Sequence, residues 1–255
     1  MSRNFILAAI GLLALAFIAV VALLEPIPQD VGYHQFVDTS SVLGIANGLN
    51  TLSNLPFILV GIFGLIDLAK GSSVRYLSKL KLAYGLLFLG SILVGFGSGY
   101  YHLHPDNDTL IWDRLPMTVA FMALFAIIVA EFVSERMGAA MLWPAIALGA
   151  ASVLYWAYTE AHQQGDLRPY VIVQFLPMLI IPVVLLAFPS RFTHISGYWY
   201  LLLCYLLAKA AEHFDGQIFA LLGFVSGHSL KHLLAALGLL VLALSYRQRE
   251  IRRLG

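Results

Sequence analysis

The chain has 255 residues, of which 60 % are hydrophobic and 11 % are charged, with a formal net charge of +1 and a mean hydropathy of +0.83. This composition excludes a soluble globular protein, because so few charged residues cannot cover its surface. The balanced charge and the lack of a large basic cluster exclude nucleic acid as a partner. The single cysteine, Cys204, lies in an apolar stretch and provides no disulfide framework. We therefore expect an integral membrane protein.

Eight stretches are apolar, fully or nearly so, over the roughly 20 residues that a helix needs to cross a bilayer. They are Phe5–Leu24, Leu43–Ala69, Leu80–His102, Asp113–Val133, Ala139–Thr159, Tyr170–Phe188, Tyr198–Phe214 and Gly227–Tyr246. The second is interrupted by three asparagines and the seventh ends in charged residues, so these two fit the pattern least well. No low-complexity linker and no clear repeat separates them. The sequence predicts an all-α fold, a polytopic membrane bundle with eight spans.

The first stretch, Phe5–Leu24, follows a short head and has to be distinguished from a signal peptide. Its apolar run is longer than the roughly 7–15 residues of a typical signal core. No cleavage motif of small residues follows it before Glu25 and Pro26. We expect a retained anchor helix.

Lysine and arginine collect in alternate loops, which predicts the orientation of the chain. One set of loops holds Arg3, Lys70, Arg75, Lys79, Lys81, Arg136, Arg191, Arg247, Arg249, Arg252 and Arg253. The other set holds Glu25, Asp30, Asp38, Asp106, Asp108, Glu160 and Asp166, with Arg114 and Arg168 among its few bases. Because positive loops stay inside, both termini are predicted to be cytoplasmic, which requires an even number of spans and agrees with eight.

Two pairs of polar residues lie near the ends of predicted spans. Ser98 and His102 close the third span, and His228 and His232 open the eighth. Residues four apart lie on one face of a helix. Asp113 opens the fourth span. Because successive spans cross the membrane in opposite directions, the end of the third span and the starts of the fourth and eighth all lie in the non-cytoplasmic leaflet. Ionisable groups are costly in a membrane, so we expect a functional site here.

Three imidazoles and a carboxylate are the side chains of a catalytic zinc site, in which neutral nitrogen ligands leave a position for water beside an acid/base group. We predict His102, His228 and His232 as ligands of Zn²⁺, Asp113 as general base and then acid, and Ser98 as a donor to the oxyanion. Simpler readings exist: an interfacial histidine, or a serine bonded to its own helix backbone. The common depth of the two motifs favours the metal.

Further polar residues lie near the same end of the predicted bundle. Lys209, Glu212, Asp215 and Lys231 are interpreted as a structural ion cluster, or alternatively as groups that orient a histidine. Arg168 and Gln174, at the mouth of the sixth span, are candidates for a polar group of the substrate, although Arg168 is equally explained as a loop charge. Loop positions predict that His34, His104, His162 and His194 are solvated. Trp112, Trp143, Trp156 and Trp199 fit an interfacial aromatic belt.

Four motifs occur in a distinctive order. They are Asn50-x-x-Ser53-Asn54, Gly97-Ser98-x-x-x-His102, Asp113-x-Leu115-Pro116-Met117 and His228-x-x-x-His232. In combination, from about Val37 to Tyr246, they resemble the alkaline ceramidase family, which belongs to a superfamily of seven-helix membrane hydrolases that includes the adiponectin and progestin receptors. The resemblance implies a zinc-dependent amide hydrolase that cleaves ceramide or a related N-acyl lipid to a fatty acid and an amine. It assigns Zn²⁺ to the three histidines, completes the site with Ser98 and Asp113, and makes Asn50 and Asn54 further candidates.

The resemblance also implies a division into two parts: residues 1–36 as a transmembrane anchor with an outer loop, and residues 37–255 as the seven-helix ceramidase-like domain. Eukaryotic members bind calcium through an acidic cluster before and within the first core helix. This chain has Asn47 where a glutamate is expected and only Asp38 upstream, which argues against a calcium site. The implied partner is a membrane lipid, with no protein partner.

Two other classes of protein remain open from the sequence. A lipid receptor or sensor would use the zinc structurally and bind lipid with little turnover. An ion-coupled transporter would use Lys209, Glu212 and Asp215 as a relay, although inverted repeats and broken helices are not evident. Haem ligation is disfavoured because His228 and His232 share one helix face.

Overall fold

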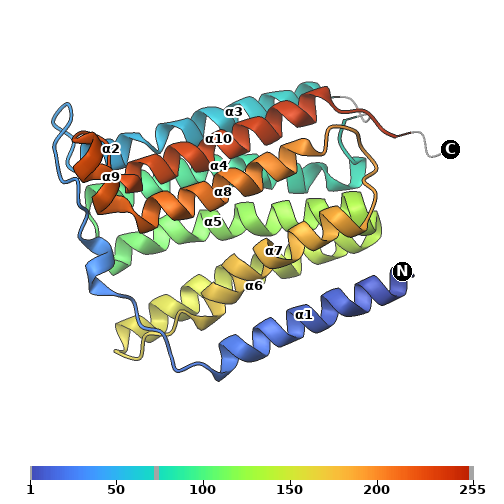
Figure 1. The fold of residues 1–255 in the computed structure, drawn as a ribbon, viewed down its shortest axis with the longest axis horizontal. Coiled ribbons are helices and arrows are strands. Elements are labelled where there is room, and N and C mark those ends of the chain that lie inside the picture. Colours follow the sequence, from blue (N-terminus) through green and yellow to red (C-terminus); the bar gives the residue numbers. More distant parts are fainter. Residues whose placement is uncertain (1, 72–74, 253–255) are drawn as a thin grey trace.

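The structure, a computed structural model, describes residues 2–71 and 75–252, and Arg253 of the charge pattern lies outside the described residues. Its elements are α1 (Arg3–Leu23), η1 (Val31–His34), α2 (Gly48–Leu52), α3 (Leu55–Lys70), η2 (Ser78–Leu80), α4 (Lys81–Leu103), α5 (Asn107–Ile128), η3 (Val129–Val133), α6 (Glu135–Ala161), α7 (Arg168–Ala187), α8 (Ser196–His213), α9 (Asp215–Leu222) and α10 (Gly227–Gln248). The long helices run side by side, and the start of α1 and the end of α10 lie at one end of the bundle (Figure 1). The predicted all-α membrane bundle is confirmed.

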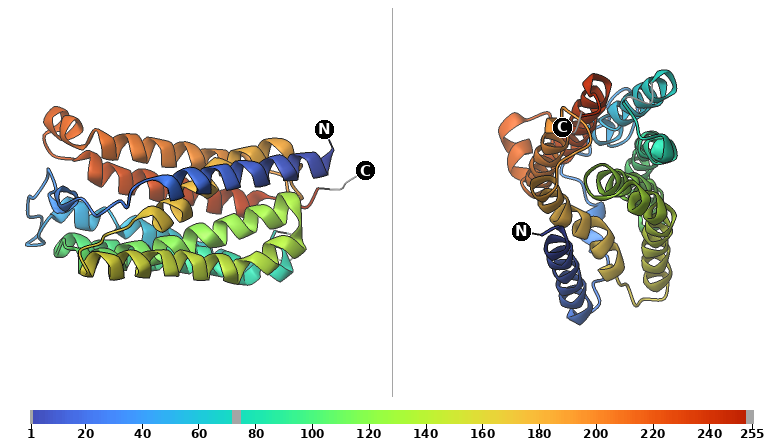
Figure 2. Two further views of the ribbon diagram at one scale, coloured as in Figure 1. Left: turned by 90° about the horizontal axis from the view of Figure 1, so that it is seen from below. Right: turned by 90° about the vertical axis from the view of Figure 1, so that its right-hand side faces the viewer.

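Seven of the described helices are long and apolar enough to cross a membrane, counting α2 with α3, η2 with α4, and η3 with α5. The remaining long helix, α8, has 18 residues and packs against α10 (Figures 1 and 2). Its sequence is less apolar because it carries Lys209 and Glu212 on a face that lines a cavity. The eight predicted stretches therefore correspond to eight bundle helices, of which seven meet the criterion for a span.

The helices pack in a chain that encloses the centre of the bundle. Helix α8 packs on α10, α10 on α3, α3 on α4, α4 on α5, and α5 on α6 and α7. Helix α1 lies at the edge and packs mainly against α7 (Figure 2). Among the described residues, α7 and α8 make little contact with each other, so the ring is weakest between these two helices.

Helix α5 begins six residues before the predicted start of the fourth span. A capping box explains the difference: Thr109 N donates to Asp106 Oδ1 at 2.7 Å, and Asp106 N donates to Thr109 Oγ1 at 3.2 Å. The hydrogen bond from the Thr109 backbone also holds the pKa of the Asp106 carboxyl below its ordinary value. Asp113 therefore lies in the second turn of the helix, and the prediction that it opens the span was wrong.

The second span was predicted to begin at Leu43, which is five residues before the helix begins in the structure. Leu43 and Asn47 have φ angles of 54° and 47°, in the left-handed region. Such residues cannot continue a right-handed helix, and asparagine tolerates this conformation better than most side chains. The helix accordingly begins at Gly48, and residues 43–47 form the turn before it.

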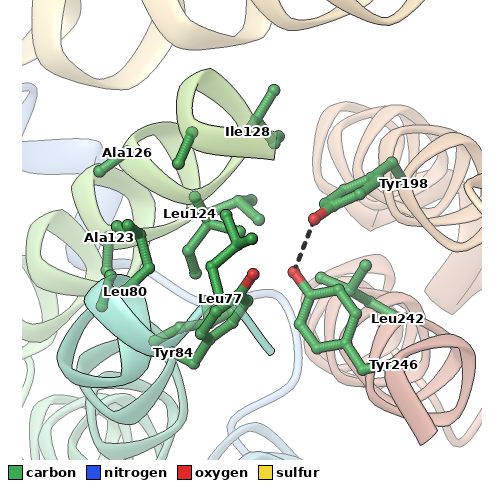
Figure 3. Packing of buried hydrophobic residues seen from close by; sticks show 14 of the residues in the cluster. Leu77, Leu80, Tyr84, Ala123, Leu124, Ala126, Ile128, Tyr198, Leu242 and Tyr246 are labelled. Carbon is green, nitrogen blue, oxygen red and sulfur yellow. Dashed lines mark hydrogen bonds between the residues drawn. The ribbon is translucent and has the colours of Figure 1, made fainter. Parts of the chain in front are cut away.

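The largest hydrophobic cluster fills the half of the bundle nearest the termini. Leu80, Leu124 and Leu242 contribute to it from η2, α5 and α10, together with Leu77, which directly precedes η2 (Figure 3). Figure 3 also shows Tyr84, Tyr198 and Tyr246 directing their hydroxyls toward one place, with Tyr198 and Tyr246 hydrogen-bonded at 3.0 Å.

Those hydroxyls surround a buried ion pair. Arg249 Nη1 donates to Glu131 Oε1 at 2.7 Å, and both side chains are almost fully buried. Tyr84 and Tyr198 donate to the two carboxylate oxygens of Glu131 at 2.5 and 2.8 Å. Glu131 lies in the π-helical turn η3, and Arg249 directly follows α10. This network, which we call the Glu131 cluster, ties the end of α10 to the end of α5.

Candidate metal centre

Three histidines from two helices meet at the end of the bundle opposite the termini. His102 lies in the last turn of α4, and His228 and His232 lie in the first two turns of α10 (Figure 1). The ring of His102 is 4.8 Å from that of His228 and 4.9 Å from that of His232, centroid to centroid. All three are buried, and one nitrogen of each lies within 4.8 Å of the other two. The predicted convergence of these rings is confirmed, and the group could hold a metal ion.

Close helix contacts bring the neighbouring residues to the same place. A Cβ at Gly97 would overlap the carbonyl oxygen of Trp112, so α4 touches α5 there. Ser98 and Asp113, the next residue on each helix, consequently line one cavity. A Cβ at Gly227 would likewise overlap a backbone carbonyl of α8, so α10 begins in contact with that helix.

The hydrogen bonds of His232 fix which of its nitrogens faces the other rings. Its Nδ1 lies 2.8 Å from Ser53 Oγ, and Ser53 Oγ donates to Asn50 O at 3.1 Å. Because a hydroxyl has one hydrogen, the His232 Nδ1–H donates to the serine. Asn54 Nδ2 lies farther away, 3.4 Å from the same nitrogen, and makes its shorter bond to Asn50 O. Nε2 of His232 therefore keeps a free lone pair.

The distances between the ring nitrogens test whether an ion fits. His102 Nε2 and His228 Nε2 are 3.4 Å apart. Two nitrogen ligands at the usual 2.0–2.1 Å from a tetrahedral zinc would be separated by about 3.3 Å. His102 Nδ1 is buried without a hydrogen-bond partner among the described residues, so Nε2 is the nitrogen with a polar neighbour. Three neutral nitrogens at this spacing fit a tetrahedral metal ion with one open position.

The start of α10 is held by residues from two other parts of the chain, α2 and α9. Asn50 Oδ1 accepts hydrogen bonds from Ser229 Oγ at 2.7 Å and Ser226 Oγ at 3.1 Å. Asp215 Oδ1 accepts from the backbone N–H of His228 at 2.7 Å. These contacts fix the first turn of α10 and thereby the position of the His228 ring.

The segment between α1 and α2 covers the histidines. The Phe36 ring lies 4.7 Å from His102 and 5.1 Å from His228, centroid to centroid, and is itself buried. Asn47 Nδ2 donates to the carbonyl of His102 at 2.7 Å. Asp38, the upstream acid, accepts from Ser40 and is buried. Residues before position 37 therefore contribute to the site as well as to the outer loop.

A cavity of about 310 Å³ extends from His232 into the bundle. Its polar end is lined by Ser98, Asp113, Arg114, Lys231, Glu212 and Asn54, and its remaining wall is mostly apolar. Along α4 the lining runs from Ser98 to Leu87, about 16 Å at 1.5 Å per residue. This depth is close to one leaflet of a bilayer whose hydrocarbon core is about 30 Å thick. The cavity therefore has the depth and polarity to take one lipid chain with its polar end near the histidines.

The predicted ion cluster forms at the polar end of this cavity, with one exception. Glu212 accepts from Lys231 at 2.5 Å and from Lys209 at 2.8 Å. Asp215 is not part of this network, because its carboxylate binds the start of α10 instead. Gln174 lines the cavity and lies 3.5 Å from Tyr205 Oη.

Two other expectations, those for His34 and Trp156, were wrong, and for Arg168 the structure agrees with the loop-charge alternative. Arg168 is not among the residues that line the cavity; it pairs with Asp166 at 2.9 Å, and this hydrogen bond holds the pKa of the Asp166 carboxyl below its ordinary value. His34 is half-buried and bonds to Tyr101 Oη at 3.0 Å rather than to solvent alone. Trp156 is fully buried and belongs to no interfacial belt.

Arg114 is the main cavity residue that the sequence reading missed. It was counted among the bases of the outer loops because the predicted span began only one residue before it, whereas α5 places it in the second turn, 7 % exposed. An arginine adjacent to the candidate acid Asp113, once both lie inside a span, is the signal that would have identified it. Ser53 was quoted as part of a motif but given no role, and it binds His232.

The fold and the site together define a helical membrane protein with a buried three-histidine centre at the end of a lipid-sized cavity. A family model described as Ceramidase matches residues 40–249, and the chain belongs to the ceramidase family. Membership implies an amide hydrolase that acts on a membrane lipid. None of the curated proteins compared with the chain matches it.

Proposed function

We propose that this protein is a zinc-dependent amide hydrolase that cleaves ceramide or a related N-acyl lipid to a fatty acid and an amine. One observation carries the proposal: three buried imidazoles meet, and one of them, His232, lines the polar end of a deep, mostly apolar cavity that is also lined by the buried carboxyl group of Asp113. His102, His228 and His232 would hold the ion. When bound, Zn²⁺ supplies a Lewis acid that polarises an amide carbonyl and makes water more acidic.

Asp113 and Ser98 perform the remaining chemistry. The Asp113 carboxylate takes a proton from the attacking water and returns it to the amide nitrogen as the C–N bond breaks, a role typically worth about 10²–10⁴ in rate. The Ser98 hydroxyl donates to the carbonyl oxygen as negative charge develops on it. Asn54 Oδ1, buried in the cavity wall without a partner among the described residues, accepts a donor group of the substrate. The apolar wall holds the acyl chain and excludes water.

The loop charges support an orientation in the membrane, and the helix packing supports a route for the substrate. Both termini are cytoplasmic, and the histidines lie toward the non-cytoplasmic leaflet, as the loop charges predict. The lipid enters from the bilayer between α7 and α8, where the ring of helices is weakest. Residues 1–36 form an anchor that also contributes Phe36 and Tyr33 to the site, and residues 37–255 form the hydrolase domain.

The test uses the full-length protein purified in detergent. Zinc content is measured by elemental analysis, and fatty acid release is measured with N-palmitoyl-sphingosine. We expect His228→Ala and His232→Ala to lose zinc and turnover, with the exposed His162→Ala as a matched control that keeps both. Asp113→Asn should keep zinc and lose at least about 100-fold in kcat. Hydrolysis retained by the His232→Ala variant would overturn the proposal.

A further inference from the structure

Arg114 is a buried cation without a counter-ion of its own. Its guanidinium carbon lies 4.3 Å from the centre of the Trp156 ring and 5.0 Å from that of Tyr170, and no carboxylate within the described residues forms an ion pair with it. Nη2 donates to Gln29 Oε1 at 2.7 Å, whereas Nη1 is buried with no hydrogen-bond partner among the described residues. An unpaired N–H on a buried cation is costly, which distinguishes this residue from the fully satisfied Arg249.

The charges at the polar end of the cavity leave one positive charge in excess. Lys209, Lys231 and Arg114 line it together with only two carboxylates, those of Glu212 and Asp113. Glu212 is shared by both lysines. When Asp113 acts on the amide, nothing else in the cavity wall neutralises Arg114. The excess therefore matches a ligand with a single negative charge.

The position of Arg114 limits where that negative charge can be. Arg114 follows Asp113 on α5, so their side chains leave the helix about 100° apart, and both line the same cavity. Arg114 and Lys231 approach the same Tyr33 ring, at 5.8 and 6.0 Å from its centre. A group bound by Arg114 is next to the amide on which Asp113 acts. It belongs to the amine part of the substrate, because the acyl chain occupies the apolar part of the cavity.

We propose that Arg114 binds a carboxylate carried by the amine part of the substrate, so that the preferred substrate is an anionic N-acyl lipid such as an N-acyl amino acid. The inference rests on the proposed function. It deepens that function by naming the chemical class of the headgroup. The free Nη1 can donate one charge-assisted hydrogen bond to a carboxylate oxygen. A fatty acid product also carries a carboxylate, and the experiment separates these two sources.

The experiment compares N-palmitoyl-serine with N-palmitoyl-ethanolamine, which differ only in the carboxylate. We expect kcat/KM of the zinc-loaded protein to favour the serine conjugate by about 10- to 100-fold, the effect of one charge-assisted hydrogen bond. Arg114→Gln should remove most of this preference, mainly by raising KM for the serine conjugate. Arg114→Lys should keep part of it. Arg191→Gln, a change at an exposed arginine, is the matched control.

A binding measurement keeps the inference testable if the Arg114 variants do not fold. In Asp113→Asn, calorimetric Kd values for the two lipids should differ in the same direction and by a similar factor. If Asp113→Asn binds the serine conjugate preferentially but the unmodified, zinc-loaded protein cleaves neither lipid, the hydrolase is refuted and the anion site is supported. Equal Kd values, or an equal loss for both lipids in Arg114→Gln, would overturn the inference. It would also be overturned if Arg114→Gln changed only inhibition by palmitate.

Discussion

Ser53 offers a sharp test of how the fold prepares His232. Its hydroxyl accepts the Nδ1–H of His232 at 2.8 Å and donates to Asn50 O, so it selects the tautomer with a free lone pair on Nε2. Ser53→Ala removes this acceptor without adding volume. The buried Nδ1–H then loses its closest partner, and the ring is free to adopt the other tautomer or to rotate away from His102.

The expected loss is in zinc affinity rather than in fold. Removing the group that orients a metal-binding histidine typically weakens metal affinity by about 10- to 100-fold, or about 1.4–2.7 kcal/mol. The assay is a competition titration of Zn²⁺ between the purified protein and a chelator of known affinity. Ser245→Ala is the matched control, because that hydroxyl bonds only to the Leu242 carbonyl of its own helix. It should bind zinc like the unmodified protein.

Two results would refute this reasoning. If Ser53→Ala and Ser245→Ala bind zinc equally well, the serine does not control the imidazole. If Ser53→Ala unfolds at a lower temperature by more than a few degrees while its zinc affinity is unchanged, the hydroxyl has only a structural role.

Three further predictions concern other parts of the molecule. Glu131→Gln should lower the free energy of unfolding in detergent by about 3–5 kcal/mol, because it leaves Arg249 buried without its counter-ion. Gly97→Ala should cost about 1–3 kcal/mol and reduce turnover, because the new methyl group forces α4 away from the Trp112 carbonyl and separates Ser98 from Asp113. Phe121→Ala should shift hydrolysis toward longer acyl chains, because Phe121 lines both the main cavity and a smaller apolar cavity of about 50 Å³ beside it.

Each of these three predictions has a control variant at a comparable residue. Glu135→Gln alters a half-exposed pair with Arg191 and should change stability by no more than about 1 kcal/mol. Gly99→Ala adds the same methyl group where its nearest neighbour is 4.0 Å away, and it should be neutral. Phe96→Ala removes an exposed ring and should leave chain-length preference unchanged. A variant that matches its control would contradict the corresponding prediction.

The helices and the histidine group could be predicted because their signals are local. Runs of about 20 apolar residues mark membrane helices whatever their neighbours are, and two histidines four residues apart share a face on any helix. The errors at helix starts came from caps and turns. The capping box at Asp106 lies outside the apolar run, so hydropathy alone started α5 too late and turned Arg114 into a loop charge.

The contacts between distant segments could not be predicted in the same way. Nothing in the local sequence of Trp156 says that Arg114 will stack on it, and nothing around Phe36 says that it will cover His102. The Arg168 side chain was free, by sequence, to reach the cavity, and it pairs with Asp166 because that carboxylate is only two residues away. Which partners a polar side chain finds depends on tertiary packing, for which a single sequence carries no periodic signal.

The Glu131 cluster has a consequence for how the chain is made. Glu131 is synthesised 118 residues before Arg249, so its carboxyl lacks this cationic partner while those residues are added. Until Arg249 is synthesised, the ion pair that joins the end of α5 to the end of α10 cannot form. A prematurely terminated polypeptide would keep this defect permanently, which gives cellular quality control a means to distinguish unfinished chains from finished ones.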